Sequence, residues 1–208
     1  MEAATAEDDL VSRALERWRT ERRALVDVGR ALCSGQRPGT SAHDHLLGAY
    51  LSTLTAQFQG FCADLLTDIA RALVGGVPLG VPAPVAAALD AAMTAGRAVD
   101  AGNPTVRNLD RDFGRFGLRV SAALTAINPA SPERLGGLSA LLRARNAVAH
   151  ATADLSTLGP GGRPLTTDRA DGWRHDIDVL ADTLDEAVRH HLRTEFGLVV
   201  RFAEEDSS

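Results

Sequence analysis

The sequence predicts an all-α protein, a bundle of long antiparallel helices with shorter helices inserted between them. Apolar residues recur at spacings of three and four over most of the 208 residues, which is the period of a helix with one buried face. Clusters of glycine and proline divide these periodic stretches into segments of helical length. No stretch predicts a strand convincingly, although residues 198–202 could form a short extended piece.

The two longest periodic stretches come early, and Gly35, Pro38 and Gly39 separate them. The first helix is expected over residues 10–32, with an apolar side formed by Leu15, Trp18, Leu25, Val28 and Leu32. The second begins near Ser41 and stops at Gly75-Gly76. Its buried stripe is expected to comprise Leu47, Leu51, Leu54, Phe58, Phe61, Leu65, Ile69 and Leu73. Because this stripe continues without a break, we expect the second helix to be the spine of the core.

Shorter helices follow a connector rich in proline and glycine over residues 77–84. An alanine-rich helix is expected to run to about residue 96. Asn103-Pro104 then opens a helical stretch whose apolar residues are Val106, Leu109, Phe113 and Phe116. A third short helix spans residues 120–127 and is closed by Asn128-Pro129.

Two long helices complete the predicted bundle. Ser131-Pro132-Glu133 predicts a helix start, with a hydroxyl at the cap, proline in the first turn and an acid near the positive end of the dipole. This helix should reach about residue 150, and the glycine-rich stretch 152–164 should be a loop. Thr166 or Thr167 caps the last helix, which ends near Gly197 and has an inner face of Trp173, Ile177, Leu180, Leu184 and Val188. We expect a single domain over residues 1–203 and a disordered acidic tail over 204–208.

Composition limits the classes of partner. All 22 basic residues are arginine and the net charge is −5, which argues against the broad basic field of a general duplex-DNA or membrane-surface binder. A local arginine patch that recognises RNA is still allowed. Cys33 and Cys62 are isolated, without the spacing of a zinc site, and fit a reducing compartment. No apolar run reaches the roughly 18 residues of a membrane span, and residues 1–9 are acidic and do not resemble a secretory signal. We therefore expect a cytoplasmic protein without a membrane partner, metal or cofactor.

The most informative segment is Arg145-Asn146-Ala147-Val148-Ala149-His150. Arg145 continues an apolar stripe formed by Leu135, Leu138 and Leu142. A guanidinium cannot stay in an apolar interior without a partner, so this stripe ends at a second chain, a cleft or a carboxylate. Asn146 and His150 are four residues apart and share one helix face, which the long Arg145 side chain can reach. A cation, an amide and an imidazole that converge in this way can hold a phosphate and move a proton beside it.

The pattern Arg145-Asn146-x-x-x-His150, late in a helix of an all-α bundle, resembles the signature of the HEPN superfamily. Residues 138–150, LSALLRARNAVAH, resemble the sequence pattern of these proteins. The earlier apolar helix over 46–73 and the later capped helix also fit their helix order. The chain is most similar to bacterial stand-alone HEPN proteins of the RiboL-PSP type. About two-thirds of the chain fits the resemblance, and residues 77–104 are not diagnostic.

The resemblance implies a homodimer in which two copies of the motif face each other across a cleft. It implies a hydrolase, a metal-independent endoribonuclease of a toxin–antitoxin or other defence system, with an antitoxin protein as a further partner. The RNA 2′-hydroxyl would attack its own phosphate, leaving a 2′,3′-cyclic phosphate and a 5′-hydroxyl. His150 would take or give the proton, because histidine titrates near neutral pH. Arg145 would hold the phosphoryl oxygens with two parallel donors, and Asn146 would orient His150 or donate to the phosphate.

Other interpretations of the motif are also open. Some HEPN proteins are inactive, so the chain could be a non-catalytic module that binds RNA, a nucleotide or a protein partner. A purely structural helical dimer is a third option. In that case Arg145 pairs with an internal acid such as Asp178 or Asp182, and a protonated His150 stabilises the C-terminal end of its helix.

Two arginine clusters are further candidates for contact with RNA. Arg107, Arg111 and Arg115, continued by Arg119, recur every four residues and should line one helix face. No acidic residue shares that stripe, although a solvated face is the commoner outcome. The first helix carries a second cluster, Arg13, Arg17, Arg19, Arg22 and Arg23. Pairs with Glu16 and Glu21 within the helix are the default explanation there, and a track for the RNA backbone is the alternative.

The histidines outside the motif carry weaker signals. His43-Asp44-His45 suggests a metal site, but these positions do not converge on a helix and no third ligand is evident. We expect a solvated helix start there. His190-His191 is expected to be a surface pair, with His190 within reach of the same groove as the motif, and His175 has no assigned role.

Overall fold

The computed structural model describes residues 11–76, 82–150 and 164–198. Within these ranges the chain is helical with no strand, which confirms the predicted all-α bundle. The loop expected over 152–164, the connector over 77–84, the extended piece over 198–202 and the tail over 204–208 fall wholly or largely outside them. No helix in the described part of the chain combines the length and the apolar character needed to cross a membrane.

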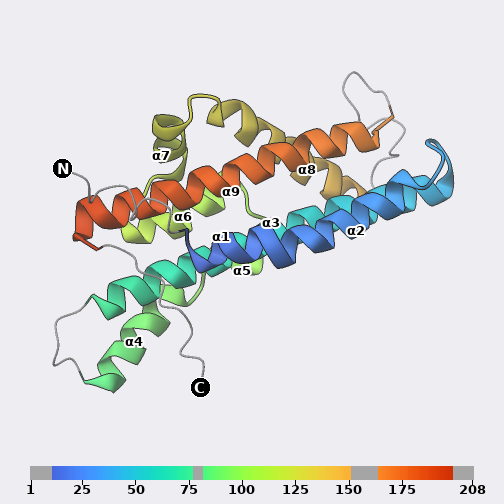
Figure 1. Cartoon of the computed structure of the whole chain (residues 1–208). Coiled ribbons are helices and arrows are strands. Elements are labelled where there is room, and N and C mark those ends of the chain that lie inside the picture. The colour runs from blue at the N-terminus through green and yellow to red at the C-terminus, as the bar shows by residue number, and fades with distance from the viewer. Residues whose placement is uncertain (1–10, 77–81, 151–163, 199–208) are drawn as a thin grey trace.

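Four long segments form the bundle and lie lengthwise beside one another (Figure 1). They are α1–α2 (Arg13–Arg17 and Arg23–Ser34, joined by a π-helical turn), α3 (Ser41–Gly75), α8 (Ser131–Ala149) and α9 (Thr167–Phe196). Helix α3 packs against α1, α2, α8 and α9. Figure 1 also shows α4 (Ala83–Thr94) beside the end of α3, which it contacts.

The core is built on α3, as its apolar periodicity predicts. Thr40 caps this helix by accepting a hydrogen bond from the His43 backbone N–H, and the predicted stripe is buried as far as Ile69. Trp18 of the π-helical turn meets Phe58 edge to face, with ring centroids 6.1 Å apart, and Phe58 stacks on Phe61 at 5.9 Å. Aromatic pairs in these geometries add to the stability gained from burial alone, so this cluster fastens α1–α2 to α3.

The predicted apolar side of the first helix is wrong beyond Trp18. Leu25, Val28 and Leu32 are 54%, 59% and 56% exposed, while Val26 and Cys33 are buried. The cause is the π-helical turn over Trp18–Arg22, which contains one more residue than an α turn. An extra residue rotates every later side chain by about 100° around the axis. The exposed residues therefore form an apolar stripe on α2 that nothing in the described chain covers.

Several arginines of the first helix pair with aspartates on other helices, and within the described residues no ion pair with Glu16 or Glu21 is observed. Arg22 Nη2 lies 2.7 Å from Asp64 Oδ2 on α3, and Arg19 Nη2 lies 2.9 Å from Asp182 Oδ1 on α9. Further pairs join Arg17 to Asp64, Arg23 to Asp178 and Arg30 to Asp171. Each partly exposed pair contributes little alone, but together they hold α1–α2 in register with α3 and α9.

The short helices are α4, α5 (Ala98–Ala101), α6 (Val106–Phe113), a 3-10 turn (Gly114–Phe116) and α7 (Val120–Ile127). Helix α7 has the predicted bounds, whereas α4 buries no residue. Buried Arg97 joins this region to α3, because its Nη1 donates to the Ala63 carbonyl and to Thr67 Oγ1. Buried Asp112 accepts the backbone N–H groups of residues 98 and 99 and so fixes the start of α5.

The ends of α8 and α9 agree with the sequence analysis in all but one respect. Ser131 is the first residue of α8 and not its cap, because its buried hydroxyl donates to the Leu124 carbonyl of α7 at 3.0 Å. Thr166 caps α9 by accepting from the Arg169 N–H at 3.3 Å. Gly197 ends α9 in the left-handed conformation with φ of 65°, a conformation that glycine adopts without strain.

We expect Gly48→Ala to destabilise the fold, because Gly48 lets α3 approach the end of α8. A Cβ added there would lie 2.7 Å from Val148 Cγ1, and valine has little rotamer freedom with which to move aside. The expected loss is about 1–2 kcal/mol in the free energy of unfolding, measured by urea denaturation. In a Val148→Ala background the clash is absent, and Gly48→Ala should then stabilise α3 through helix propensity. Equal effects in both backgrounds would contradict this contact.

Candidate functional site

Arg145 and Asn146 lie near the end of α8 and are both partly buried. The leucines that precede them on the stripe are buried, so Arg145 stands where the apolar face of α8 ends. Arg145 Nη1 donates to Asn146 Oδ1 at 3.1 Å. Arg145 Nε is buried and has no hydrogen-bond partner. Among the described residues, the guanidinium therefore meets one neutral side-chain acceptor, the Asn146 amide oxygen.

A second asparagine, which the sequence analysis does not single out, completes the cluster. Asn103 Nδ2 donates to Asn146 Oδ1 at 3.0 Å, and Asn108 Nδ2 donates to the Asn103 carbonyl at 2.8 Å. Arginine has only donors, so the atom of Asn146 that faces Arg145 must be Oδ1, and Asn103 must present its NH₂ group. We name Arg145, Asn146 and Asn103 the Arg–Asn cluster.

The backbone that carries Asn103 is anchored on both sides. On its N-terminal side, Gln59 of α3 donates to the Val99 carbonyl at 2.6 Å. On its C-terminal side, Thr105 caps α6 by accepting from the Asn108 N–H at 3.2 Å. Asn103 therefore meets Asn146 from a fixed position, although the two residues are 43 positions apart in the sequence.

His150 lies one turn beyond Asn146 and is exposed. It is the C-cap residue of α8, and its backbone N–H donates to the Asn146 carbonyl at 3.0 Å. No hydrogen bond joins its imidazole to Arg145, Asn146 or Asn103. One chain thus brings Arg145 and Asn146 together and places His150 at the adjacent helix end.

The two internal acids considered as partners for Arg145 are engaged elsewhere. Asp178 accepts a hydrogen bond from Trp18 Nε1 at 3.2 Å and lies 3.6 Å from Arg23 Nη2, and Asp182 pairs with Arg19. Burial raises the pKa of Asp178, and the nearby Arg23 opposes that rise. Among the residues that the structure describes, Arg145 forms no ion pair, so its positive charge has no carboxylate beside it.

The predicted ridge of four arginines is interrupted, so the expectation of one common face is wrong. Helix α6 ends at Phe113, a 3-10 turn follows, and Gly117 adopts the left-handed conformation with φ of 84°. Arg115 lies in that turn and donates to the carbonyls of residues 95 and 96, while Arg119 precedes α7. The two arginines left on α6, Arg107 and Arg111, are exposed and form no ion pair within the described ranges. Because Asn108 of the same helix bonds to Asn103, α6 begins beside the Arg–Asn cluster.

The remaining histidines have structural partners or are exposed. His43 is buried, contrary to the expected solvated turn, with Nε2 3.3 Å from Thr167 Oγ1 and Nδ1 3.2 Å from Asp44 Oδ1. His191 Nε2 donates to the Phe116 carbonyl at 2.7 Å, and His175 and His190 are exposed. In the described segments no group of three or more histidine, cysteine or acidic side chains is arranged to hold a metal ion.

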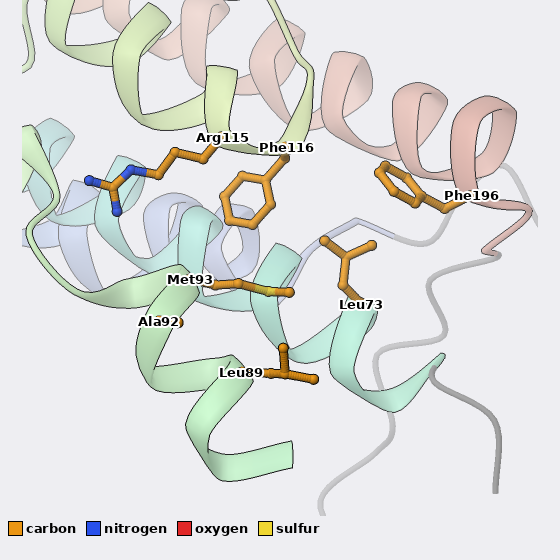
Figure 2. Close-up of a pocket in the computed structure, with 7 residues that line it drawn as sticks. All are labelled: Leu73, Leu89, Ala92, Met93, Arg115, Phe116 and Phe196. Carbon is orange, nitrogen blue, oxygen red and sulfur yellow. The ribbon is translucent and has the colours of Figure 1, made fainter. Parts of the chain in front are cut away.

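Two apolar pockets lie away from the Arg–Asn cluster. The larger, of about 640 Å³, is bordered by α4, the end of α3, the 3-10 turn and the end of α9. Figure 2 shows Leu73, Leu89, Met93, Phe116 and Phe196 around it, with the Arg115 guanidinium directed away. A smaller pocket of about 300 Å³ lies between the exposed stripe of α2 and α3. Neither of these two pockets is lined by residues of the Arg–Asn cluster.

Comparisons with family models, curated proteins and solved structures find no match to this chain. In the part of the chain that the structure describes, the cluster consists of a guanidinium without an ion-pair partner and an amide held by two donors, with an exposed imidazole one turn away.

Proposed function

We propose that this chain is a HEPN-like, metal-independent endoribonuclease that acts as a homodimer on RNA. One observation carries the proposal: within the described residues, the Arg–Asn cluster presents a guanidinium and an amide that form no ion pair with a carboxylate. Arginine recognises phosphate through parallel hydrogen bonds as well as through charge. The exposed His150 lies one helical turn from this cluster and supplies an imidazole, a group that can accept or donate a proton.

The proposed reaction uses a nucleophile that belongs to the substrate. The RNA 2′-oxygen forms a bond to the adjacent phosphorus, and the bond from phosphorus to the 5′-oxygen breaks. One proton leaves the 2′-hydroxyl and one is delivered to the departing 5′-oxygen, which leaves a 2′,3′-cyclic phosphate and a 5′-hydroxyl. Arg145 stabilises the charge that develops on the phosphoryl oxygens, and His150 accepts or donates a proton. No metal or cofactor takes part in these steps.

A homodimer would provide the second proton-transfer group. Each chain contributes one His150, so a paired site holds one imidazole as base and another as acid. The exposed Arg107 and Arg111 favour RNA as the substrate, because they lie on α6, which begins beside the cluster, and add positive charge that can contact an RNA backbone. We place this activity in the cytoplasm, in a defence or toxin–antitoxin setting, with an antitoxin protein as partner.

A specific observation favours a second candidate, a non-catalytic module that binds RNA, a nucleotide or a protein partner. The His150 imidazole makes no hydrogen bond to the Arg–Asn cluster within one chain. A binding module needs the guanidinium and amide donors alone, whereas a nuclease also needs the imidazole within reach of the phosphate. Turnover distinguishes the two candidates.

The proposal predicts that the purified protein cleaves a structured RNA in the presence of EDTA. The products should carry 2′,3′-cyclic phosphate and 5′-hydroxyl ends, which end-specific enzymes and mass spectrometry identify. A substrate with a single 2′-deoxynucleotide at the cleaved position should resist cleavage there, because the nucleophile is missing. Cleavage of that substrate at an unchanged rate would contradict the mechanism. Binding of several RNAs without cleavage would favour the second candidate.

A further inference from the structure

The orientation of the Asn146 amide determines which ligand the Arg–Asn cluster can accept. Its Oδ1 receives two hydrogen bonds, from Arg145 Nη1 at 3.1 Å and from Asn103 Nδ2 at 3.0 Å. With Oδ1 occupied in this way, Nδ2 must point to the other side of the amide. In the described structure Nδ2 has no acceptor, so both of its protons are available to a ligand.

We propose that Asn103 is a positioning residue that holds the Asn146 NH₂ group beside the Arg145 guanidinium, so that together they bind a phosphoryl oxygen. This inference rests on the proposed function and assigns Asn103 a part in it. Without Asn103, a single contact from Arg145 would hold the amide. The second donor removes the rotation of the Asn146 side chain, and a preorganised donor contributes more to anion binding than a mobile one.

The surroundings of Asn103 suit a positioning role. The Asn108 side chain donates a hydrogen bond to the Asn103 carbonyl at 2.8 Å. Gln59 of α3 holds the preceding segment by donating to the Val99 carbonyl. Asn103 itself contributes no charge to the cluster. A carboxylate at this position would accept where Asn103 donates, and it would face Arg145 and Asn146 with a negative charge.

Two substitutions separate these effects. Asn103→Ala removes the donor, and Asn103→Asp keeps the shape but reverses the hydrogen bond. In Asn103→Asp we expect the Asn146 amide to turn and donate to the new carboxylate, which would also neutralise Arg145. Asn128→Asp is the matched control, because it adds the same charge at the end of α7, where Oδ1 accepts the residue 130 N–H and a carboxylate can do the same.

The test is titration with inorganic phosphate, followed by NMR of the Asn146 side-chain NH₂ and the Arg145 NεH, with RNA cleavage measured in parallel. In the wild type and in Asn128→Asp, phosphate should shift both signals. Asn103→Ala should weaken phosphate binding about tenfold, and Asn103→Asp should abolish the response at an unchanged unfolding midpoint. An Asn146 signal that responds equally in wild type and Asn103→Asp, or no response in the wild type, would overturn the inference. Phosphate responses as expected with no RNA cleavage would uphold the role of Asn103 and refute the nuclease.

Discussion

His150→Ala is expected to reduce the rate of RNA cleavage by a factor of about 10²–10⁴ while leaving the fold and RNA binding unchanged. The reason is that the imidazole is exposed at the end of α8 and contributes no side-chain hydrogen bond to the described structure. Its removal therefore takes away a proton-transfer group without taking away packing. The measurement is kcat and KM on a labelled RNA, with the loss confined to kcat.

Arg145 should behave differently from His150 in the same assay. Arg145→Ala removes binding as well as stabilisation of the developing charge, so KM should rise and kcat should fall. Arg145→Lys should restore little, because an ammonium cannot present two parallel donors. His175→Ala and Arg143→Ala are matched controls, since His175 is exposed on α9 and Arg143 is exposed on α8. Cleavage by His150→Ala at the wild-type rate would show that the activity belongs to another site.

Trp18→Ala is expected to have the largest effect on stability among single changes in the first helix, about 3–5 kcal/mol. Trp18 is 2% exposed and contacts both Phe58 and Phe61 of α3. Urea denaturation followed by circular dichroism measures the change. Leu25→Ala is the matched control, because this residue lies outside the core and should change stability by about 0.5 kcal/mol or less. Similar losses from the two variants would contradict the rotation that the π-helical turn introduces.

The loss of stability in Trp18→Phe should depend on pH, and this dependence separates the contribution of the hydrogen bond from that of packing. Trp18 Nε1 donates to Asp178 Oδ1 at 3.2 Å. Burial raises the pKa of Asp178, and this hydrogen bond is among the contacts that lower it. Removing the donor raises the pKa of the folded state further, so the ionised carboxylate stabilises the fold less. The stability difference between wild type and Trp18→Phe should therefore grow as pH rises through the pKa of Asp178, and a difference independent of pH would contradict the contact.

The sequence predicts helices well where the apolar periodicity agrees with the residues that begin and end helices, such as caps, glycine and proline. The buried stripe of α3 continues as far as Ile69, and α7 has its predicted ends, because both depend on residues near in sequence. The prediction is wrong at Leu25 because the extra residue of the π-helical turn cannot be recognised from the amino-acid composition of that segment. It is wrong at Ser131 because a serine that caps a helix and one that donates to a neighbouring helix are alike in sequence.

In the candidate site, too, the contact between residues near in sequence could be predicted and the contact between distant residues could not. Arg145 and Asn146 are adjacent in one helix, so their proximity follows from helix geometry. Asn103 could not be singled out, because its contact with Asn146 depends on how the segment before α6 docks on α3. The arginines from Arg107 to Arg119 show the opposite error. Their spacing in the sequence is regular, but α6 ends at Phe113, so Arg115 and Arg119 lie outside that helix.

The π-helical turn at Trp18–Arg22 affects how this chain should be compared with any relative. A relative with one residue fewer in this turn would have a regular helix, and its buried positions would follow a different register after Trp18. An alignment that matches leucines to leucines across this segment would then pair exposed positions of one protein with core positions of the other. For this part of the chain the alignment gap belongs inside a helix, where gaps are usually penalised.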